Sequence, residues 1–261
     1  MSQEAYHVRC LAWRACHNAR DVGGYPALNG GRTRWKVLVR ADNLQRLTPE
    51  GQTALCNYGV RTIIDLRSPH ELERHANPFA AQQGVAGAPR YLNLALVDYD
   101  DREFVAAMAA AKSMLSEYCI ILERSKHRIA EVIEAVAAGM EEGGVLVHCH
   151  GGKDRTGIIV ALLLSLAGIP RETIVEDYAL SETLLEPSYS AWLQEQSQAQ
   201  GGSMERPAWM YTPPETMHGV FDYLDRAYGG EEGYLEAAGV PPICMEQVCK
   251  SLVSPVGDAG S

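Results

Sequence analysis

Short apolar runs alternate with longer segments of helical periodicity through most of this chain. Their β-branched and apolar content predicts strands over residues 35–40, 60–66, 90–96 and 145–148. The first of these belongs to a short hairpin in an N-terminal region rich in Gly, Asn and Arg. Strands that alternate with helices are typical of an α/β fold, with a central, mostly parallel sheet flanked by helices on both faces.

Helical periodicity, caps and proline positions predict the helices 48–58, 68–75, 101–138 (broken near Ser113), 155–167, 170–180, 215–228 and 231–239. Residues 155–167 are apolar on nearly every side, which is typical of a buried helix. The C-terminal part is therefore expected to be helical. Residues 181–214 turn to Gln, Ser, Gly, Pro, Trp and Tyr, which predicts either a mobile lid or a connection between helices.

Residues 254–261 are expected to form a disordered tail. The chain has no internal repeat and no linker that would divide it, so residues 1–261 are predicted to form a single domain.

The charge balance restricts the partners of the protein. The formal net charge is −10, which argues against non-specific binding to nucleic acid or to an anionic membrane. An anionic substrate would need a local positive site. The longest apolar run, 158–164 with an extension to 169, is too short to span a bilayer, so stable membrane insertion is not expected.

The cysteines and the N-terminus bear on location. The seven cysteines are odd in number and lack zinc-type spacing, so a reduced, intracellular protein is expected. The N-terminal segment lacks the apolar core of a signal peptide. A cytoplasmic location is therefore predicted, with export by a route without a signal peptide left open. The oligomeric state is left open too.

One polar stretch directly follows a strand predicted to be buried. HCHGGKDRTG, residues 148–157, places Cys149 and Arg155 six positions apart, with Thr156 next. A five-residue loop at the start of a helix turns several backbone N–H groups into one concavity, which fits a phosphate. The guanidinium of Arg155 can bind two phosphate oxygens. The candidate phosphate-binding residues are His150, Gly151, Gly152, Lys153, Asp154, Arg155 and Thr156.

The same positive surroundings favour the thiolate of Cys149, a strong nucleophile that would lie below the phosphorus atom. Gly151 and Gly152 suit a loop whose backbone turns sharply and approaches its ligand closely. The hydroxyl of Thr156 could donate to the sulfur and ease its departure when a phosphocysteine is hydrolysed.

HCHGGKDRTG resembles the HC-x5-R-[ST] signature of cysteine-dependent protein tyrosine phosphatases. Its HCxxGKDRT form is similar to the bacterial and fungal tyrosine/serine phosphatase branch. The resemblance spans about residues 13 to 250. It includes the blocks 18–24 (NARDVGG), 39–40, 59–71, 177–178 and 233–240.

The resemblance implies a phosphatase fold that uses no metal or other cofactor, with Cys149 as nucleophile and Arg155 as phosphate clamp. It also implies relaxed specificity, with a phosphorylated protein, a phosphoinositide or a small phosphate ester as substrate. Lys153 is similar to a lysine that phosphoinositide phosphatases carry in this loop. No Trp-Pro-Asp segment occurs to supply the general acid. Asp154 is the preferred candidate, and Asp65, at the end of a central strand, is the alternative.

Other interpretations remain. A small-molecule phosphatase acting on inositol phosphates or nucleotides would use the same loop. A rhodanese-type sulfur carrier would not require Arg155 and Thr156, and a non-catalytic phosphate-binding module would not require the full set of catalytic residues. His148 and His150 flank the cysteine, but no second ligand cluster accompanies them, so a metal site is not expected. His148 is expected to orient the loop by hydrogen bonds.

Overall fold

The computed structural model describes residues 8–200, 202 and 204–254. The strands in chain order are β1 (Arg20–Asp21), β2 (Arg32–Thr33), β3 (Leu38–Ala41), β4 (Val60–Asp65), β5 (Arg90–Asn93), β6 (Gly144–His148) and β7 (Val253–Ser254). Within the described residues, five of them form one sheet in the order β1-β3-β6-β4-β5, and β2 pairs with β7. The neighbours β3, β6, β4 and β5 are parallel, and β1 is antiparallel to β3. The mostly parallel sheet expected from the sequence is confirmed.

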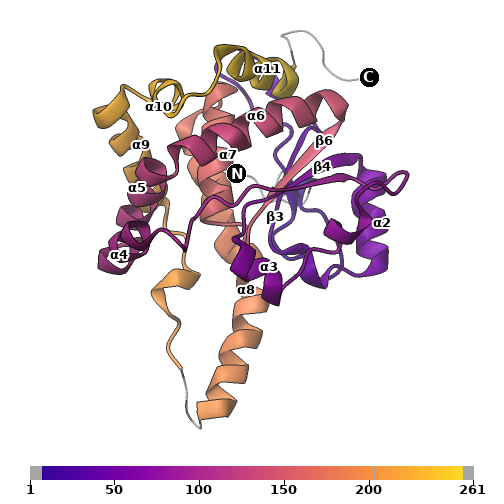
Figure 1. Cartoon of the computed structure of the whole chain (residues 1–261), viewed down its shortest axis with the longest axis vertical. Coiled ribbons are helices and arrows are strands. Elements are labelled where there is room, and N and C mark those ends of the chain that lie inside the picture. The colour runs from indigo at the N-terminus through magenta and orange to yellow at the C-terminus, as the bar shows by residue number, and fades with distance from the viewer. Residues whose placement is uncertain (1–7, 201, 203, 255–261) are drawn as a thin grey trace.

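Alternate side chains of the central strands enter two separate apolar cores, as the period of two along a strand requires. Leu38 and Ile64 lie in the larger core, together with side chains from α5, α6 and α7. Val39, Ile63 and Leu146 point the opposite way and pack in a smaller core with α2. Both faces of the sheet are therefore covered by helices, as expected (Figure 1).

The α-helices are α2 (Pro49–Tyr58), α3 (Pro69–Arg74), α4 (Arg102–Ala110), α5 (Met114–Arg124), α6 (Lys126–Glu142), α7 (Arg155–Leu166), α8 (Arg171–Gln200), α9 (Pro214–Tyr228), α10 (Glu231–Ala238) and α11 (Pro242–Leu252). Short 3-10 turns are η1 (Leu44–Arg46), η2 (Ala80–Gln82) and η3 (Ala208–Met210). The predicted start of α2 is confirmed, because the Thr48 side chain accepts a hydrogen bond from the backbone of Gly51. In the described part of the chain, no helix is both long and apolar enough to cross a membrane.

The helix predicted to end near Leu180 continues as α8 to Gln200. The prediction of a lid or a connection over residues 181–214 is therefore corrected for its first twenty residues, which are helical. Pro187 lies inside the helix without ending it. Apolar packing explains the extra length, because Leu185 and Tyr189 form a small satellite core with Met210 on the returning segment. In Figure 1 this half of α8 projects away from the sheet. A role as a lid remains a prediction.

Four smaller differences concern element limits. The strand predicted over 90–96 is β5, which ends at Asn93. The first strand predicted over 35–40 is β3, which starts only at Leu38, because Lys36 has a positive φ in the preceding turn. The helical region 101–138 is interrupted a second time, at Ser125, and extends to Glu142. Ser254, predicted to begin the disordered tail, pairs with Arg32 in β7. The rest of that tail, 255–261, lies outside the described residues.

Candidate active site

The candidate loop leaves the middle strand of the sheet. β6 is buried throughout, lies between β3 and β4, and ends at His148, which is in register with Ala41 and Asp65. Cys149 follows with 1% of its surface exposed, and α7 starts at Arg155. The predicted order of buried strand, loop and buried helix is confirmed. We call residues 149–155 the phosphate loop.

The carbonyl oxygens of the phosphate loop are bound from outside the loop. His150 O accepts from the backbone N–H of Asn43 at 2.9 Å. Gly151 O accepts from the side-chain amide of Asn18 at 2.9 Å, and Gly152 O accepts from Nη2 of Arg40 at 2.8 Å.

The described peptide bonds are trans, so each N–H points away from the carbonyl of its own peptide. The N–H groups of residues 151, 152 and 153 are therefore turned toward the inside of the loop. Such a nest of N–H groups suits an anion.

The structure requires glycine at only one of the two glycine positions of the loop. Gly152 has φ of +66°, and a Cβ there would lie 2.7 Å from the backbone nitrogen of Asp42 and closer still to the carbonyl oxygen of Ala41. Gly152 therefore lets the loop pack directly on the end of β3. Gly151 lacks a positive φ, and a Cβ there would be in ordinary van der Waals contact, 3.6 Å from Lys153 Cγ. The local backbone does not require glycine at this position.

Arg155 is held by a carboxylate that the sequence did not identify as its partner. Nη1 of Arg155 lies 2.6 Å from Oε2 of Glu71, and Nη2 lies 2.8 Å from Oε1. Glu71 also completes a capping box with Ser68 at the start of α3. Burial opposes ionisation of Glu71, but the hydrogen bonds and charge of Arg155 outweigh it and lower the pKa of Glu71 to about 2. Glu71 therefore fixes the guanidinium plane. In the sequence, Glu71 was noted only as the end of the 59–71 block of the resemblance, with no role assigned to it.

Asp154 lies at the last loop position, beside two donors. Its Oδ1 accepts from the hydroxyl of Tyr118 at 2.6 Å and from Nζ of Lys153 at 2.7 Å. The Tyr118 hydroxyl lies 3.0 Å from that of Tyr178. The Asp154 side chain is 37% exposed, whereas that of Lys153 is almost buried. Tyr118 comes from α5 and was not predicted, because nothing in the local sequence connects it to the loop.

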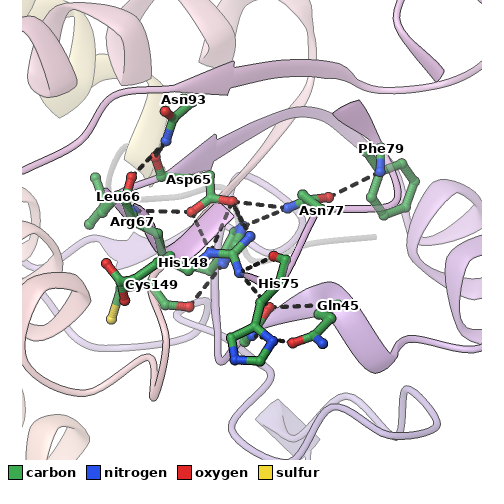
Figure 2. A network of polar contacts seen from close by, with 12 residues as sticks. Gln45, Asp65, Leu66, Arg67, His75, Asn77, Phe79, Asn93, His148 and Cys149 are labelled. Carbon is green, nitrogen blue, oxygen red and sulfur yellow. Dashed lines mark hydrogen bonds and ion pairs between the residues drawn. The ribbon is translucent and has the colours of Figure 1, made fainter. Parts of the chain in front are cut away.

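Asp65 lies at the end of β4, within the network of polar contacts in Figure 2. It has no exposed surface. Its carboxylate forms an ion pair with Arg67 at 2.6 Å and also accepts from Asn77 and from the hydroxyl of Tyr91. Nε2 of His148 lies 3.3 Å away. Burial favours the neutral acid, but His148 and Arg67 outweigh it and hold the pKa of Asp65 well below its usual range.

His148 and Thr156 complete the surroundings of Cys149. The other ring nitrogen of His148, Nδ1, lies 3.1 Å from the carbonyl oxygen of Cys149, so the imidazole connects the Asp65 network to the loop (Figure 2). Oγ1 of Thr156 is buried, and within the described residues no hydrogen-bond partner takes it. A buried hydroxyl without a partner is uncommon and suggests a role toward the sulfur or the ligand.

A cavity of about 530 Å³ lies beside the phosphate loop. Its lining residues come from α3 and its flanks, from the β5–α4 connection and from the loop: Ser68, His70, Glu71, Arg74, His75, Tyr99 and His150. Burial lowers the pKa of His150. A larger cavity, of about 990 Å³, lies at the far end of α7, between α8, α10 and α11. Its described lining includes no residue of the phosphate loop.

The described residues contain no group of three or more His, Cys, Asp or Glu side chains arranged to hold a metal ion. The candidate site consists of the Cys149 thiol, the nest of N–H groups and the Arg155 guanidinium. Two carboxylates accompany them: Glu71 contacts Arg155, and Asp154 contacts Lys153.

Comparisons with known proteins show the family of the chain. A tyrosine-protein phosphatase of Nostoc commune is 34% identical over 232 residues, which cover 86% of this chain and 75% of the relative. The triple specificity protein phosphatase PtpB of Mycobacterium tuberculosis is 31% identical, with coverage of 85% and 91%. The crystal structure of P. aeruginosa TpbA aligns over 80% of this chain and 90% of its own, with a TM-score of 0.39 and 16% identity, a likeness too weak to bear on function. The sequence model of the tyrosine phosphatase family matches residues 11–254, so the chain belongs to the tyrosine phosphatase family.

Proposed function

We propose that this enzyme hydrolyses phosphate monoesters through a phosphocysteine intermediate on Cys149. One observation carries the proposal. Donors outside the loop bind three of its carbonyl oxygens, so the neighbouring N–H groups turn inward, and Cys149 beside them is buried. These donors would take the equatorial phosphate oxygens, with Arg155 binding two of them. Donors held in place before the reaction stabilise the charge that develops in the transition state at no reorganisation cost.

In the first step, the Cys149 thiolate attacks phosphorus and the leaving oxygen takes a proton. We assign that proton to Asp154. Asp154 is part of the loop and partly exposed, so a substrate oxygen can reach it. Asp65 is a poor candidate, because it has no exposed surface that a substrate could reach. A general acid has to be protonated and within hydrogen-bond reach of the leaving group.

In the second step, water attacks the phosphocysteine and inorganic phosphate leaves. Asp154, now ionised, accepts the proton of the attacking water. Thr156 would donate its hydroxyl to the departing sulfur, which is consistent with a buried Oγ1 that has no partner within the described residues. Each proton that leaves Asp154 in the first step returns to it in the second.

The proposed substrates are phosphotyrosine and, with relaxed specificity, phosphoserine, phosphothreonine and phosphoinositides. The cavity beside the loop would hold the rest of the substrate, and its Arg74 and three histidines suit a second anionic group. PtpB, a relative of similar length, is named for triple specificity. Hydrolysis of inositol phosphates or nucleotides would use the same loop. The cytoplasmic location predicted from the cysteine pattern belongs to this proposal as well.

The test is phosphate release from an aryl phosphate by wild type and Cys149→Ser, with chelator and reductant present. The proposal expects activity in wild type and none in the variant. No release by a folded wild type, together with tight binding of a phosphopeptide, would instead support a non-catalytic module. A panel of phosphopeptides, phosphoinositides and nucleotides under the same conditions then ranks the substrates by kcat/KM.

A further inference from the structure

Two fully buried arginines lie behind the phosphate loop and share one carboxylate. Arg20 on β1 and Arg40 on β3 are directly opposite each other, and their side chains are 0% and 1% exposed. Asp177, from α8, lies between them. Its Oδ1 is 2.9 Å from Nε of Arg20, and its Oδ2 is 2.5 Å from Nη1 of Arg40.

Among the described residues, the other side chains that hydrogen-bond to Arg20, Arg40 or Asp177 are neutral, and Arg9, which stacks on the Tyr25 ring at 4.1 Å, adds a further cation beside them. The hydroxyl of Tyr25 donates to Asp177 Oδ1 at 3.0 Å, and burial together with Asp177 raises the pKa of that phenol well above its usual value. Ser181 Oγ accepts from Nη2 of Arg20 at 3.1 Å. The cluster therefore carries one surplus positive charge in the interior.

A surplus buried charge is a costly way to hold strands and a helix together. Burial and the charge of Arg20 lower the pKa of Arg40, although an arginine stays protonated at any physiological pH. Nε of Arg40 is buried, and within the described residues it has no hydrogen-bond partner. Well-packed apolar side chains of similar volume would hold the same elements at lower cost. Structural support alone does not explain this arrangement.

The surplus charge is directed at the phosphate loop. Nη2 of Arg40 donates to the carbonyl of Gly152 at 2.8 Å, and the N–H of that same peptide, on Lys153, faces the inside of the loop. Arg20 donates to Oδ1 of Asn18, whose amide nitrogen donates to the carbonyl of Gly151. A cation at the carbonyl end of a peptide polarises it and strengthens its N–H as a donor. The cluster therefore contacts one of the three outward carbonyls directly and a second one through Asn18.

We propose that Arg40 is a positioning residue that transmits the surplus charge of the Arg20–Asp177–Arg40 cluster to the phosphate loop, where it strengthens oxyanion binding and favours the Cys149 thiolate. The inference rests on the function proposed above, because it assumes that the loop binds phosphate. Arg40 contacts neither substrate nor sulfur in this scheme and acts through the Gly152 peptide.

The test compares wild type with Arg40→Met, Arg20→Met and the double variant Arg40→Met/Asp177→Asn. There are two readouts. One is the inhibition constant of inorganic phosphate, measured on residual aryl phosphatase activity. The other is the pH midpoint for alkylation of Cys149 by iodoacetamide, which requires no turnover. Thermal unfolding shows which variants are folded. All variants keep Arg155, Tyr99 and Tyr189, the titratable side chains that interact with the Cys149 thiol.

Arg40→Met is expected to weaken phosphate inhibition about tenfold, as loss of one charge-assisted hydrogen bond would. It should also move the alkylation midpoint up by about one pH unit, which corresponds to the same factor of ten. Arg20→Met removes the surplus charge but keeps the contact with Gly152, so its alkylation midpoint should rise as well. It also provides the test if Arg40→Met does not fold.

The double variant restores one surplus positive charge through Arg20, so its alkylation midpoint should return toward that of wild type, while phosphate inhibition stays weaker. Folded variants of Arg40 and Arg20 with wild-type phosphate inhibition and alkylation midpoint would overturn the inference and leave a purely structural cluster. A double variant whose alkylation midpoint lies as high as that of Arg40→Met would refute the role of the surplus charge. Wild type that neither hydrolyses an aryl phosphate nor is inhibited by phosphate would refute the proposed function instead.

Discussion

A methyl group is expected to be strongly destabilising at one of the two neighbouring glycines of the phosphate loop and nearly neutral at the other. Gly152→Ala places an L side chain at a φ of +66°, which costs about 1–2 kcal/mol. Its Cβ would also collide with the backbone at Ala41 and Asp42, where no side chain can move aside. Relief requires the loop to move away from β3, which adds about 1–3 kcal/mol. We expect Gly152→Ala to lose about 3 kcal/mol of unfolding free energy in total.

Gly151→Ala is the matched control. Its Cβ would make only ordinary contacts, and the substitution restricts the unfolded chain, so stability should stay within about 1 kcal/mol of wild type. Urea unfolding measures both effects, and kcat/KM for an aryl phosphate reports the loop. Gly152→Ala should lose about 100-fold in kcat/KM, because a shift of about 1 Å misdirects the N–H groups, while Gly151→Ala stays within a few-fold. Equal stability and activity of the two variants would refute this account of the loop.

Three further predictions concern the carboxylates. Glu71→Gln keeps the capping box but removes the carboxylate charge that faces Arg155. It should lower the unfolding free energy by about 2 kcal/mol at pH 7. The folded-state pKa of Glu71 is about 2 against 4.5, so this stability is present above pH 4.5 and lost as pH falls toward 2. Urea unfolding should show a smaller difference in unfolding free energy between wild type and variant at pH 3 than at pH 7. The same difference at both pH values would contradict the ion pair of Glu71 with Arg155 as its source. Asp154→Asn should lower kcat for phosphotyrosine by about 100-fold or more, and less for an aryl phosphate with a good leaving group; an equal loss on both substrates would exclude Asp154 as the acid. Asp65→Asn should instead cost about 3 kcal/mol of stability by unpairing buried Arg67, with kcat of the folded enzyme changed only a few-fold.

Local features of this fold were predictable from the sequence. The β-branched content of residues 60–66, the apolar run before His148 and the proline-marked starts of α2 and α3 all predicted elements close to those observed. In each case the signal lies within about ten residues of the element it specifies. The strand, loop and helix around Cys149 followed from the same local information.

Contacts between distant segments were not predictable. Glu71 and Arg155 are 84 residues apart, and Arg40 and Asp177 are 137 apart, so no periodicity connects them. The second half of α8 is polar enough to read as a connection, and its helical state depends on packing against Met210, a residue beyond its own end. The preference for Asp154 over Asp65 as the proposed acid likewise required the observed burial of Asp65.

The most direct measurement is a rapid-quench reaction of the enzyme with an aryl phosphate, stopped with acid and followed by mass spectrometry of the peptide that contains Cys149. The account predicts that this peptide transiently gains the mass of one phosphoryl group, and that Asp154→Asn accumulates less of it with a poor leaving group. Phosphate release with no covalent intermediate on that peptide, or with a phosphoryl group on another residue, would contradict it.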